Sequence, residues 1–492
     1  MANHSEFTDE NIQKLFGHEA AEDESFERLK QYYLKTSIYN RVTSDVPLRI
    51  LVGHKGIGKS ALIQIAISED KQNGILPLLI RPDDILEVAA SDNSFLQLIR
   101  EWKDGLYRII AQKALHSFGL NNDGISSQVM NTTGKLVSYI LDTVKGIKSI
   151  SVEPSKRIII DNFIKNNSIC VYFDDLDRGW EGKPTDISKI SALINALRDI
   201  SNNNRNIRFR LALRSDVYFL VRTSDESTDK IEGSVVWYSW TNNEILIALI
   251  KRIETYFGRE VNEQDLRGKK QRLIAHYLHS VMEPRFTGEG HWSNAPMHRV
   301  LMSLIRKRPR DLVKLCTLAA RNALNHNSNR IKTIHLKNIF EEYSQGRIQD
   351  TINEYRSELP EIERLIMGMR PSKFERKASL GYIYDTSELL KKLGNITEQG
   401  AFYFAGQRLA THKQLAQFLY KINFLTARKT RNDGKVIRKY FEENRYIYGE
   451  FVDFGFAWEV HPAYRWALQP SNIHSIFKEL ELSADDLDTS VK

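Results

Sequence analysis

The stretch from Gly53 to Ser60 carries residue types that can bind a polyphosphate. It matches the P-loop pattern G-x-x-x-x-G-K-[ST] at every fixed position. The glycines let backbone N–H groups turn inward, Lys59 can reach the β- and γ-phosphates, and the Ser60 hydroxyl can ligate Mg²⁺. We therefore predict that ATP and Mg²⁺ bind at Gly53, His54, Lys55, Gly56, Ile57, Gly58, Lys59, Ser60 and Ala61.

The flanking residues predict the strand and the helix that a P-loop requires. The run from Leu48 to Val52 is mostly apolar and reads as a buried strand entering the loop. The apolar residues from Ala61 to Ala66 recur with helical spacing. A glycine-rich turn that matched the pattern by chance would not need these flanks.

A pair of carboxylates follows another apolar run, Ile169 to Phe173, as expected for a Walker B strand. Asp174 is predicted to hold Mg²⁺ through its water shell. Asp175 is predicted to orient or deprotonate the water that attacks the γ-phosphate. The alternative is a buried strand that ends in an acidic turn without chemistry.

Arg214 ends the next predicted strand, which runs from Ile207 to Leu213. In NTPases that insert a strand between the P-loop and Walker B strands, a polar residue at this place lies beside the γ-phosphate. Arg214 is therefore a candidate catalytic sensor. The alternative is an arginine that only pairs with Asp216 or Asp177.

The order of the remaining elements predicts an α/β core of about five parallel strands. The run Val235 to Trp240 reads as the last strand, and Thr241 to Glu244 has the spacing of a capping box. The predicted organisation is a helical lead-in (1–45), an ATPase core (46–257) with a mostly helical insertion (83–161), a helical lid (258–345), a winged-helix-like domain (346–482) and a flexible tail (483–492).

A basic cluster, Arg306 to Asp311, opens a helix inside the predicted lid. Arg310 follows Pro309 directly and so falls in the first turn of that helix. A helical lid can swing one arginine onto the γ-phosphate, which makes Arg310 a second candidate sensor. The alternative is a basic helix start that is solvated or held by acidic neighbours.

The C-terminal part predicts two helices followed by a hairpin, which is the order of a winged helix. Its basic residues are interleaved with aromatic ones and could contact DNA phosphates. Many such modules serve only as protein contacts, so both interpretations stay open. The basic residues are Lys413, Lys421, Arg428, Lys429, Arg431, Lys435, Arg438 and Lys439.

The formal net charge of +8 over 492 residues permits contact with nucleic acid but does not decide it. No apolar stretch approaches the roughly 18 to 20 residues that a membrane span needs. The segment Met1 to Glu10 is polar and acidic rather than signal-like. We therefore expect a cytoplasmic protein without membrane contact.

The stretch Asp174–Arg178 resembles the Walker B signature of the KAP-type P-loop NTPases, within the wider group of STAND-like bacterial ATPases. The combination of Phe16–Glu24, Arg308–Asp311 and His461–Arg465 is similar to a bacterial P-loop ATPase family often encoded near phage-defence genes. The resemblance implies an AAA+-like core with a helical lid and a C-terminal winged helix, as in initiator-type ATPases. It makes Arg310 the lid sensor and Arg178 the Walker B arginine, a candidate finger for a neighbouring subunit. KAP proteins commonly carry inserted membrane segments, and none is found in this sequence.

The function expected from these features is an ATP-binding and hydrolysing switch, the ATPase component of a bacterial anti-phage defence assembly. No separate effector pattern is found in the sequence, so an effector would be a partner protein, and a homo-oligomer or hetero-complex is expected. One alternative is a DNA-binding initiator or loader. Another is a nucleotide-sensing scaffold that does not hydrolyse ATP.

Overall fold

The computed structural model describes most of the chain. The described residues are 6–19, 21–88, 94–120, 136–146, 154–224, 226–373, 375, 381–432, 436–445, 455–469, 476–477 and 480–483. Parts of the predicted insertion, all of the predicted tail except Ser483, and Lys435 lie outside these ranges.

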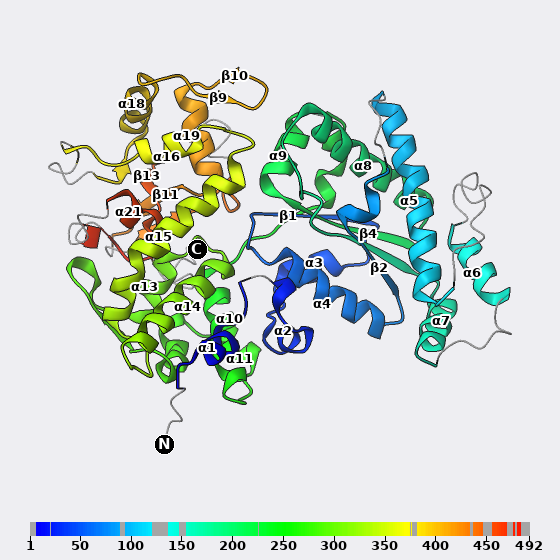
Figure 1. Cartoon of the computed structure of the whole chain (residues 1–492), viewed down its shortest axis with the longest axis horizontal. Helices are drawn as coiled ribbons and strands as arrows, with labels where there is room; N and C mark the ends of the chain where they lie inside the picture. Colours follow the sequence, from blue (N-terminus) through cyan, green and yellow to red (C-terminus); the bar gives the residue numbers. More distant parts are fainter. Residues whose placement is uncertain are drawn as a thin grey trace. The chain divides into compact units, whose positions relative to one another are not determined.

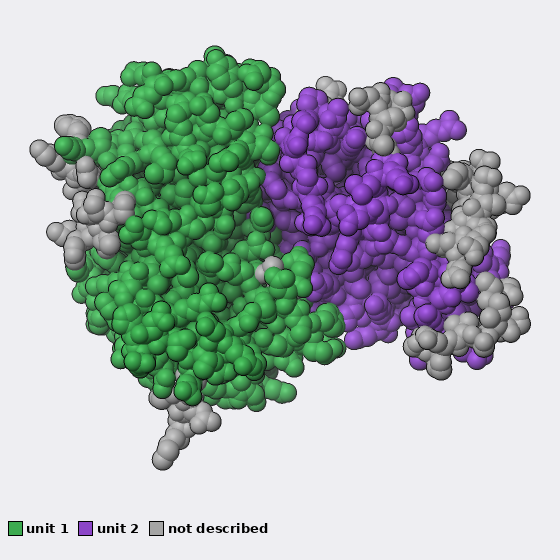
Figure 2. Space-filling view, in the orientation of Figure 1, with its two compact units in different colours: residues 1–34, 55–58, 239–492 green, residues 35–54, 59–238 purple. Residues whose placement is uncertain are grey.

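The chain divides into two compact units (Figure 2). Unit 1 comprises residues 1–34, 55–58 and 239–492, and unit 2 comprises residues 35–54 and 59–238. The four residues at the tip of the P-loop belong to unit 1, whereas the residues on both sides of the tip belong to unit 2.

Unit 2 is built on a five-stranded parallel sheet in the order β2-β3-β4-β1-β5. The strands are β1 (Leu48–Gly53), β2 (Leu76–Ile80), β3 (Ile169–Phe173), β4 (Ile207–Arg214) and β5 (Val235–Trp237). Strand β4 separates the P-loop strand β1 from the Walker B strand β3. This is the arrangement of an AAA+-type P-loop NTPase core, so the predicted fold class is confirmed.

Helices cover both faces of this sheet (Figure 1). The helices of unit 2 within the described residues are α3 (Ser37–Thr43), α4 (Lys59–Gln72), η2 (Pro82–Ile85), α5 (Phe95–Ser117), α6 (Leu136–Gly146), α7 (Pro154–Asn166), α8 (Pro184–Asn203), α9 (Ser215–Ser224) and η4 (Glu226–Ser234). Figure 1 shows α8 and α9 on one side of the sheet and α3 and α4 on the other. Parallel strands covered on both faces read as nearly continuous apolar runs, which is why they could be predicted.

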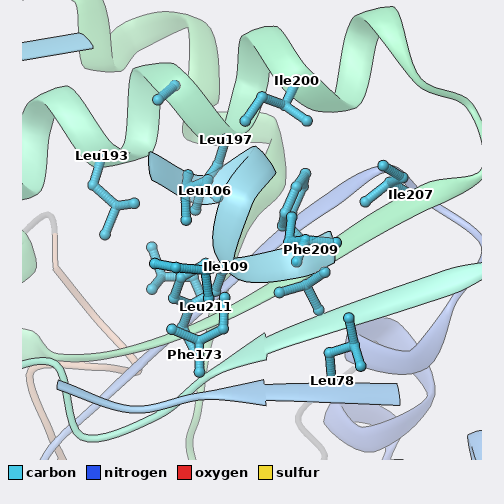
Figure 3. Packing of buried hydrophobic residues seen from close by; sticks show 14 of the residues in the cluster. Leu78, Leu106, Ile109, Phe173, Leu193, Leu197, Ile200, Ile207, Phe209 and Leu211 are labelled. Carbon is cyan, nitrogen blue, oxygen red and sulfur yellow. The ribbon is translucent and has the colours of Figure 1, made fainter. Parts of the chain in front are cut away.

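The core of unit 2 lies between the sheet and helices α5 and α8 (Figure 3). Alternate residues of each strand point to this side, because strand side chains have a period of two. Phe173, Phe209 and Leu211 meet Leu106 and Leu197 there, and all five are at most 1 % exposed. This packing holds the strand ends that carry the candidate site.

Unit 1 is mainly helical. Its helices are α1 (Asp9–Phe16), η1 (Ala21–Asp23), α2 (Phe26–Tyr32), α10 (Asn242–Tyr256), α11 (Glu263–Arg267), α12 (Gln271–Ile274), η5 (Ala275–Ser280), η6 (Gly290–Trp292), α13 (Met297–Leu304), α14 (Pro309–Asn325), α15 (Thr333–Tyr355), α16 (Ile362–Gly368), α18 (Thr386–Thr397), α19 (His412–Lys421) and α21 (Pro462–Leu468). Helix α14 packs on α1 and α15, and α15 packs on α21. The predicted capping box is present at α10, where the Thr241 side chain accepts a hydrogen bond from the Glu244 amide.

The described strands of unit 1 form two two-stranded sheets and one four-stranded sheet. They are β6 (Arg285–Thr287), β7 (Ser293–Pro296), β8 (Ile383–Tyr384), β9 (Tyr403–Phe404), β10 (Arg408–Leu409), β11 (Leu425–Thr430), β12 (Val436–Lys439) and β13 (Ala457–Val460). β6 pairs with β7 and β9 with β10, while the sheet has the order β12-β11-β13-β8. In chain order the C-terminal elements are β8, α18, the hairpin β9–β10, α19, β11, β12 and β13. This is the predicted winged-helix type of order, with the hairpin β9–β10 inserted between the helices and β12 added at the edge of the sheet.

Candidate nucleotide-binding site

The P-loop backbone has the alternating conformation of an anion-binding nest. Gly56 and Gly58 have φ values of +77° and +106°, a region that favours glycine. Helix α4 begins at Lys59, so its first N–H groups face the loop. The Lys59 ammonium donates to the carbonyls of Gly53 and His54, at 2.9 and 3.2 Å. The loop can therefore surround a phosphate with N–H groups and one cation.

The His54 side chain anchors the first part of the loop. It is 1 % exposed, and its Nδ1 lies 2.9 Å from the Ser215 hydroxyl at the start of α9. Our prediction placed His54 among the nucleotide-binding residues. Its imidazole is instead directed into unit 2, so any contact with a nucleotide comes from its backbone.

The carboxylates that follow β3 differ in exposure and conformation. Asp174 is half-buried, whereas Asp175 is exposed. Asp175 has a φ of +62°, which is uncommon for a residue other than glycine. Its N–H donates to Asp174 Oδ1 at 3.1 Å. This turn presents the Asp175 carboxylate to solvent beyond the strand end, where a water-orienting group would be needed.

Arg214 lies beside the start of the P-loop, because it is paired in register with Gly53. Its guanidinium donates from Nε and Nη2 to Asp216, at 3.0 and 2.6 Å. Its Nη1 lies 3.3 Å from Asp177 Oδ2. Both pairings that we considered as the alternative to sensing are present. The position of Arg214 beside Gly53 fits a sensor. The bonds to Asp216 and Asp177 hold its guanidinium in place.

The tip of the P-loop is bound by side chains of unit 1. The Lys55 N–H donates to Glu354 Oε1 at 3.0 Å, and the Lys55 carbonyl accepts from Arg308 Nη1 at 3.3 Å. Arg308 Nη1 also lies 3.1 Å from Glu354 Oε2. The Ile57 carbonyl accepts from Trp240 Nε1 at 2.8 Å. Two carbonyls of the tip are thus satisfied by donors outside the loop.

Arg310, the predicted lid sensor, also lies against the tip. A Cβ atom added to Gly56 would come within 3.0 Å of both Cβ and Cδ of Arg310. The Arg310 Nε donates to the Glu19 carbonyl at 2.9 Å, and the Glu19 carboxylate pairs with Lys314 at 2.9 Å. The side chain therefore lies beside the loop, as a phosphate contact would require.

Acidic neighbours hold most of the basic cluster that opens α14. Arg306 bonds both oxygens of Asp311, at 2.7 and 2.9 Å, and Arg347 adds a third contact at 2.6 Å. Burial alone would raise the pKa of Asp311, but the charges of Arg306 and Arg347 hold that pKa well below its ordinary value. Lys307 pairs with Glu443 at 2.5 Å. The alternative that we left open is thus correct for Arg306, Lys307 and Arg308.

Ion pairs also neutralise part of the C-terminal basic group. Lys421 is buried and pairs with Glu358. Arg438 is buried against Glu459, and Arg428 pairs with Glu481. Lys413 and Lys429 are exposed, and Arg431 and Lys439 are half-exposed. Three of the eight residues named for DNA contact, Lys421, Arg428 and Arg438, are therefore held in ion pairs within the protein.

Mg²⁺ would be held by few side chains here. Ser60 lies in the first turn of α4, and Asp174 follows β3. Across the described ranges, no group of three or more His, Cys, Asp or Glu side chains could hold a metal by itself. This suits Mg²⁺ bound through one or two protein ligands, phosphates and water. Arg178, the predicted finger, is exposed on the turn after Asp175.

The sequence did not reveal Glu354, Arg308 or Trp240 as loop-binding residues. Glu354 lies 299 positions from Lys55, and no local pattern links them. Arg308 belongs to the basic cluster found in the sequence. The position of Arg310 in the first turn of the helix, however, favours Arg310 as the candidate sensor. Trp240 follows the last strand of the sheet, and nothing in the sequence around it indicates that its Nε1 bonds the Ile57 carbonyl.

A family described as the FunZ-associated C-terminal helical domain matches residues 272–352. The match includes the basic cluster but ends before Glu354. The chain is also similar to the putative transposon gamma-delta 80.3 kDa protein of Escherichia coli (strain K12). The two are 23 % identical over 521 residues, covering 95 % of this chain and 70 % of that protein.

Among solved structures, the chain is similar to Cdc6p from Pyrobaculum aerophilum, with 12 % identity, a TM-score of 0.31 and coverage of 95 % and 98 % of the two chains. The Aeropyrum pernix ORC2 protein has 11 % identity to the chain and a TM-score of 0.36, and the match covers 87 % of each chain. The Aeropyrum pernix ORC1 protein in complex with DNA has 13 % identity to the chain and a TM-score of 0.30, and the match covers 91 % of this chain and 92 % of that chain. At such TM-scores, the strand order of unit 2 is the firmer basis for the fold class.

No helix within the described residues is long and apolar enough to cross a membrane.

Proposed function

We propose that the protein binds ATP with Mg²⁺, hydrolyses the β-γ phosphoanhydride and acts as a molecular switch. The observation that supports this most directly is the carboxyl edge of the parallel sheet in unit 2. The P-loop follows β1, the Walker B carboxylates follow β3, and Arg214 ends β4 between them. Ligands of open α/β sheets bind at this edge.

Each residue of this edge has a defined task in the proposed reaction. Lys59 contacts the β- and γ-phosphates, and Ser60 and Asp174 hold Mg²⁺ directly or through water. Asp175 orients the attacking water, and Arg214 reports the γ-phosphate. Bound Mg²⁺ would neutralise phosphate charge. Arg310 is the candidate for an additional positive charge, and Arg178 is the candidate finger in an oligomer.

Phosphate release from ATP by the purified full chain tests this proposal. We expect Mg²⁺-dependent turnover that Lys59→Ala abolishes, because the variant loses the phosphate contact. Arg321→Ala is a matched control, since Arg321 is an exposed cation of unit 1 that pairs with the exposed Asp9. If ATP binds but no phosphate is released, the protein is a nucleotide-sensing scaffold. If no nucleotide binds, the proposal is wrong.

DNA binding is a second candidate function, supported by the winged-helix order of the C-terminal elements. The exposed Lys413 and Lys429 would supply phosphate contacts. Fluorescence anisotropy with duplex DNA tests it, because each phosphate contact steepens the loss of affinity with salt between about 50 and 200 mM. The double variant Lys413→Gln/Lys429→Gln should flatten that slope. Absence of binding at low salt contradicts this candidate.

The cellular setting we propose is a bacterial defence assembly with a separate effector protein in the cytoplasm. Only the family resemblance supports this setting. The name of the Escherichia coli relative associates that protein with a transposon, so a setting on mobile DNA is the alternative. Mass measurement of the complex purified with and without ATP would distinguish the two, through the proteins that co-purify and the oligomeric state. Recovery of the chain alone in both conditions contradicts the effector proposal.

A further inference from the structure

The backbone N–H and carbonyl of Lys55 are both held by one buried ion pair. Glu354 Oε1 accepts from its N–H at 3.0 Å, and Arg308 Nη1 donates to its carbonyl at 3.3 Å. The two side chains meet each other at 3.1 Å, and each is 2 % exposed. All three residues belong to unit 1. Arg308 and Glu354 are called the Lys55 clamp below.

The geometry of the clamp differs from that of an ordinary structural pair in the same cluster. Arg306 and Asp311 form a two-bond fork, in which Nε and Nη2 each bond one carboxylate oxygen. In the clamp, Arg308 Nη1 makes both bonds, and Glu354 divides its two oxygens between Arg308 and Lys55. The Arg308–Glu354 pair therefore lacks the stronger two-bond fork. It contacts the N–H and the carbonyl of Lys55 instead.

This arrangement leaves polar groups of Arg308 without a partner. Its Nε and Nη2 are buried and make no hydrogen bond to any described residue. Buried donors without partners are costly, and each one calls for an explanation. Arg306 has no such unpaired nitrogen, because it makes the fork with Asp311. Arg308 instead uses one nitrogen to bond both Glu354 and the Lys55 carbonyl, so the clamp contacts the loop backbone at the expense of the fork.

Lys55, whose backbone the clamp holds, immediately precedes the first left-handed glycine of the P-loop. Gly56 follows Lys55 with a φ of +77°, and Gly58 repeats the conformation at +106°. A nest binds phosphate only if its N–H groups converge, which requires the carbonyls to point away. Arg308 draws the Lys55 carbonyl outward, and Trp240 does the same for Ile57 at 2.8 Å.

We infer that Arg308 and Glu354 are positioning residues that set the phosphate affinity of the P-loop by fixing the Lys55 peptide. This inference rests on the proposed nucleotide binding. Neither residue needs to touch the nucleotide. They act through the loop backbone, so their loss disorders the nest while Lys59 and Ser60 remain. Groups that hold a binding constellation rigid in this way are needed for its full strength.

The experiment measures the Kd for Mg²⁺-ADP by calorimetry, and Tm without nucleotide, for full-length variants. We expect Arg308→Gln and Glu354→Gln each to weaken ADP binding about tenfold or more, because small displacements of binding groups are costly. The double variant should be no weaker than the worse single variant, since both act on one peptide. Arg308→Lys should recover most of the affinity, because a single ammonium can replace Nη1.

Arg347→Gln is the matched control. Arg347 is also 2 % exposed and also bonds a buried carboxylate, Asp311. Among the described residues, its ion-pair partners are Asp311 and Asp350, neither of which belongs to the loop. Arg347→Gln should lower Tm while its ADP affinity stays within about twofold of that of the parent protein. If Arg308→Gln and Glu354→Gln lower only Tm, as this control does, the clamp is merely structural and the inference is wrong.

Three further outcomes are informative. If Arg308→Gln does not fold, Arg308→Lys and Glu354→Gln carry the test, and normal ADP affinity in Glu354→Gln overturns the inference. If the parent protein itself binds no ADP or ATP, the proposed function fails and the inference fails with it. Normal binding by the parent and by both clamp variants overturns the inference alone.

Discussion

The guanidinium of Arg214 lies 3.3 Å from the carboxylate of Asp177, so the end of β4 is ion-paired to the turn that follows the Walker B strand. A second carboxylate, Asp216, bonds the same guanidinium at 2.6 and 3.0 Å. Arg214 is 15 % exposed and Asp177 is 14 % exposed. The candidate sensor is therefore fixed to the same turn as the candidate water-orienting carboxylate.

This pairing makes the role of Arg214 testable by separating binding from turnover. We expect Arg214→Gln to lower kcat about tenfold or more with little change in ADP affinity, because the γ-phosphate is absent from ADP. Asp177→Asn leaves Arg214 bonded to Asp216 and should have a smaller effect. If both variants lower Tm and neither lowers kcat, Arg214 is structural and does not sense nucleotide.

The left-handed conformation of Asp175 decides which variant tests its catalytic role. With a φ of +62°, alanine at this position would add strain, whereas asparagine tolerates the conformation and keeps the size. We expect Asp175→Asn to bind ATP normally and to hydrolyse it about a hundredfold more slowly or worse, because the water loses its base. Radiolabelled ATP retained after gel filtration measures the trapped state. Turnover at the parent rate would show that Asp175 does not orient the water.

Gly56 is predicted to be intolerant of any side chain. Its φ is +77°, and an added Cβ would come within 3.0 Å of two Arg310 carbons. Gly56→Ala should therefore destabilise the protein by about 1 to 2 kcal/mol from the conformation alone. Thermal unfolding measures this effect. Gly346→Ala is the control: Gly346 lies within α15 with no heavy atom near its added Cβ, so alanine there should stabilise by up to about 1 kcal/mol.

The buried carboxylate of Glu459 should make the protein sensitive to acid. Burial would raise its pKa, but Arg438 and Arg465 lower that pKa from 4.5 to about 2. A group whose pKa is lowered by folding stabilises the folded state at pH values above its ordinary pKa. This stability is lost as pH falls from about 4.5 to about 2.

The matching variant is Glu459→Gln, which leaves two buried arginines without their carboxylate. It should cost about 3 to 5 kcal/mol at neutral pH. Its Tm should also fall less steeply between pH 4.5 and pH 2 than that of the parent. Measurements of Tm against pH for both proteins check this. Parallel curves would mean that other carboxylates, such as Asp311, control acid unfolding.

Sequence patterns were sufficient wherever the information is local. The P-loop, the Walker B carboxylates and the capping box at Thr241 depend on residues a few positions apart, and each lies where it was predicted. The sheet could be predicted because its buried strands are short apolar runs. The winged-helix order followed from the sequence of helices and hairpin, although β12 and the hairpin β6–β7 did not.

The amino-acid sequence by itself thus determined the fold class and the loop that should bind phosphate. Only the tertiary structure decided what the basic residues do. Arg428 and Arg438 resemble DNA-binding residues until Glu481 and Glu459 are placed beside them. The Lys55 clamp joins residues 299 positions apart. Such partners are chosen by packing of distant segments, because burial forces each charge to find an opposite charge, and no local spacing encodes which one.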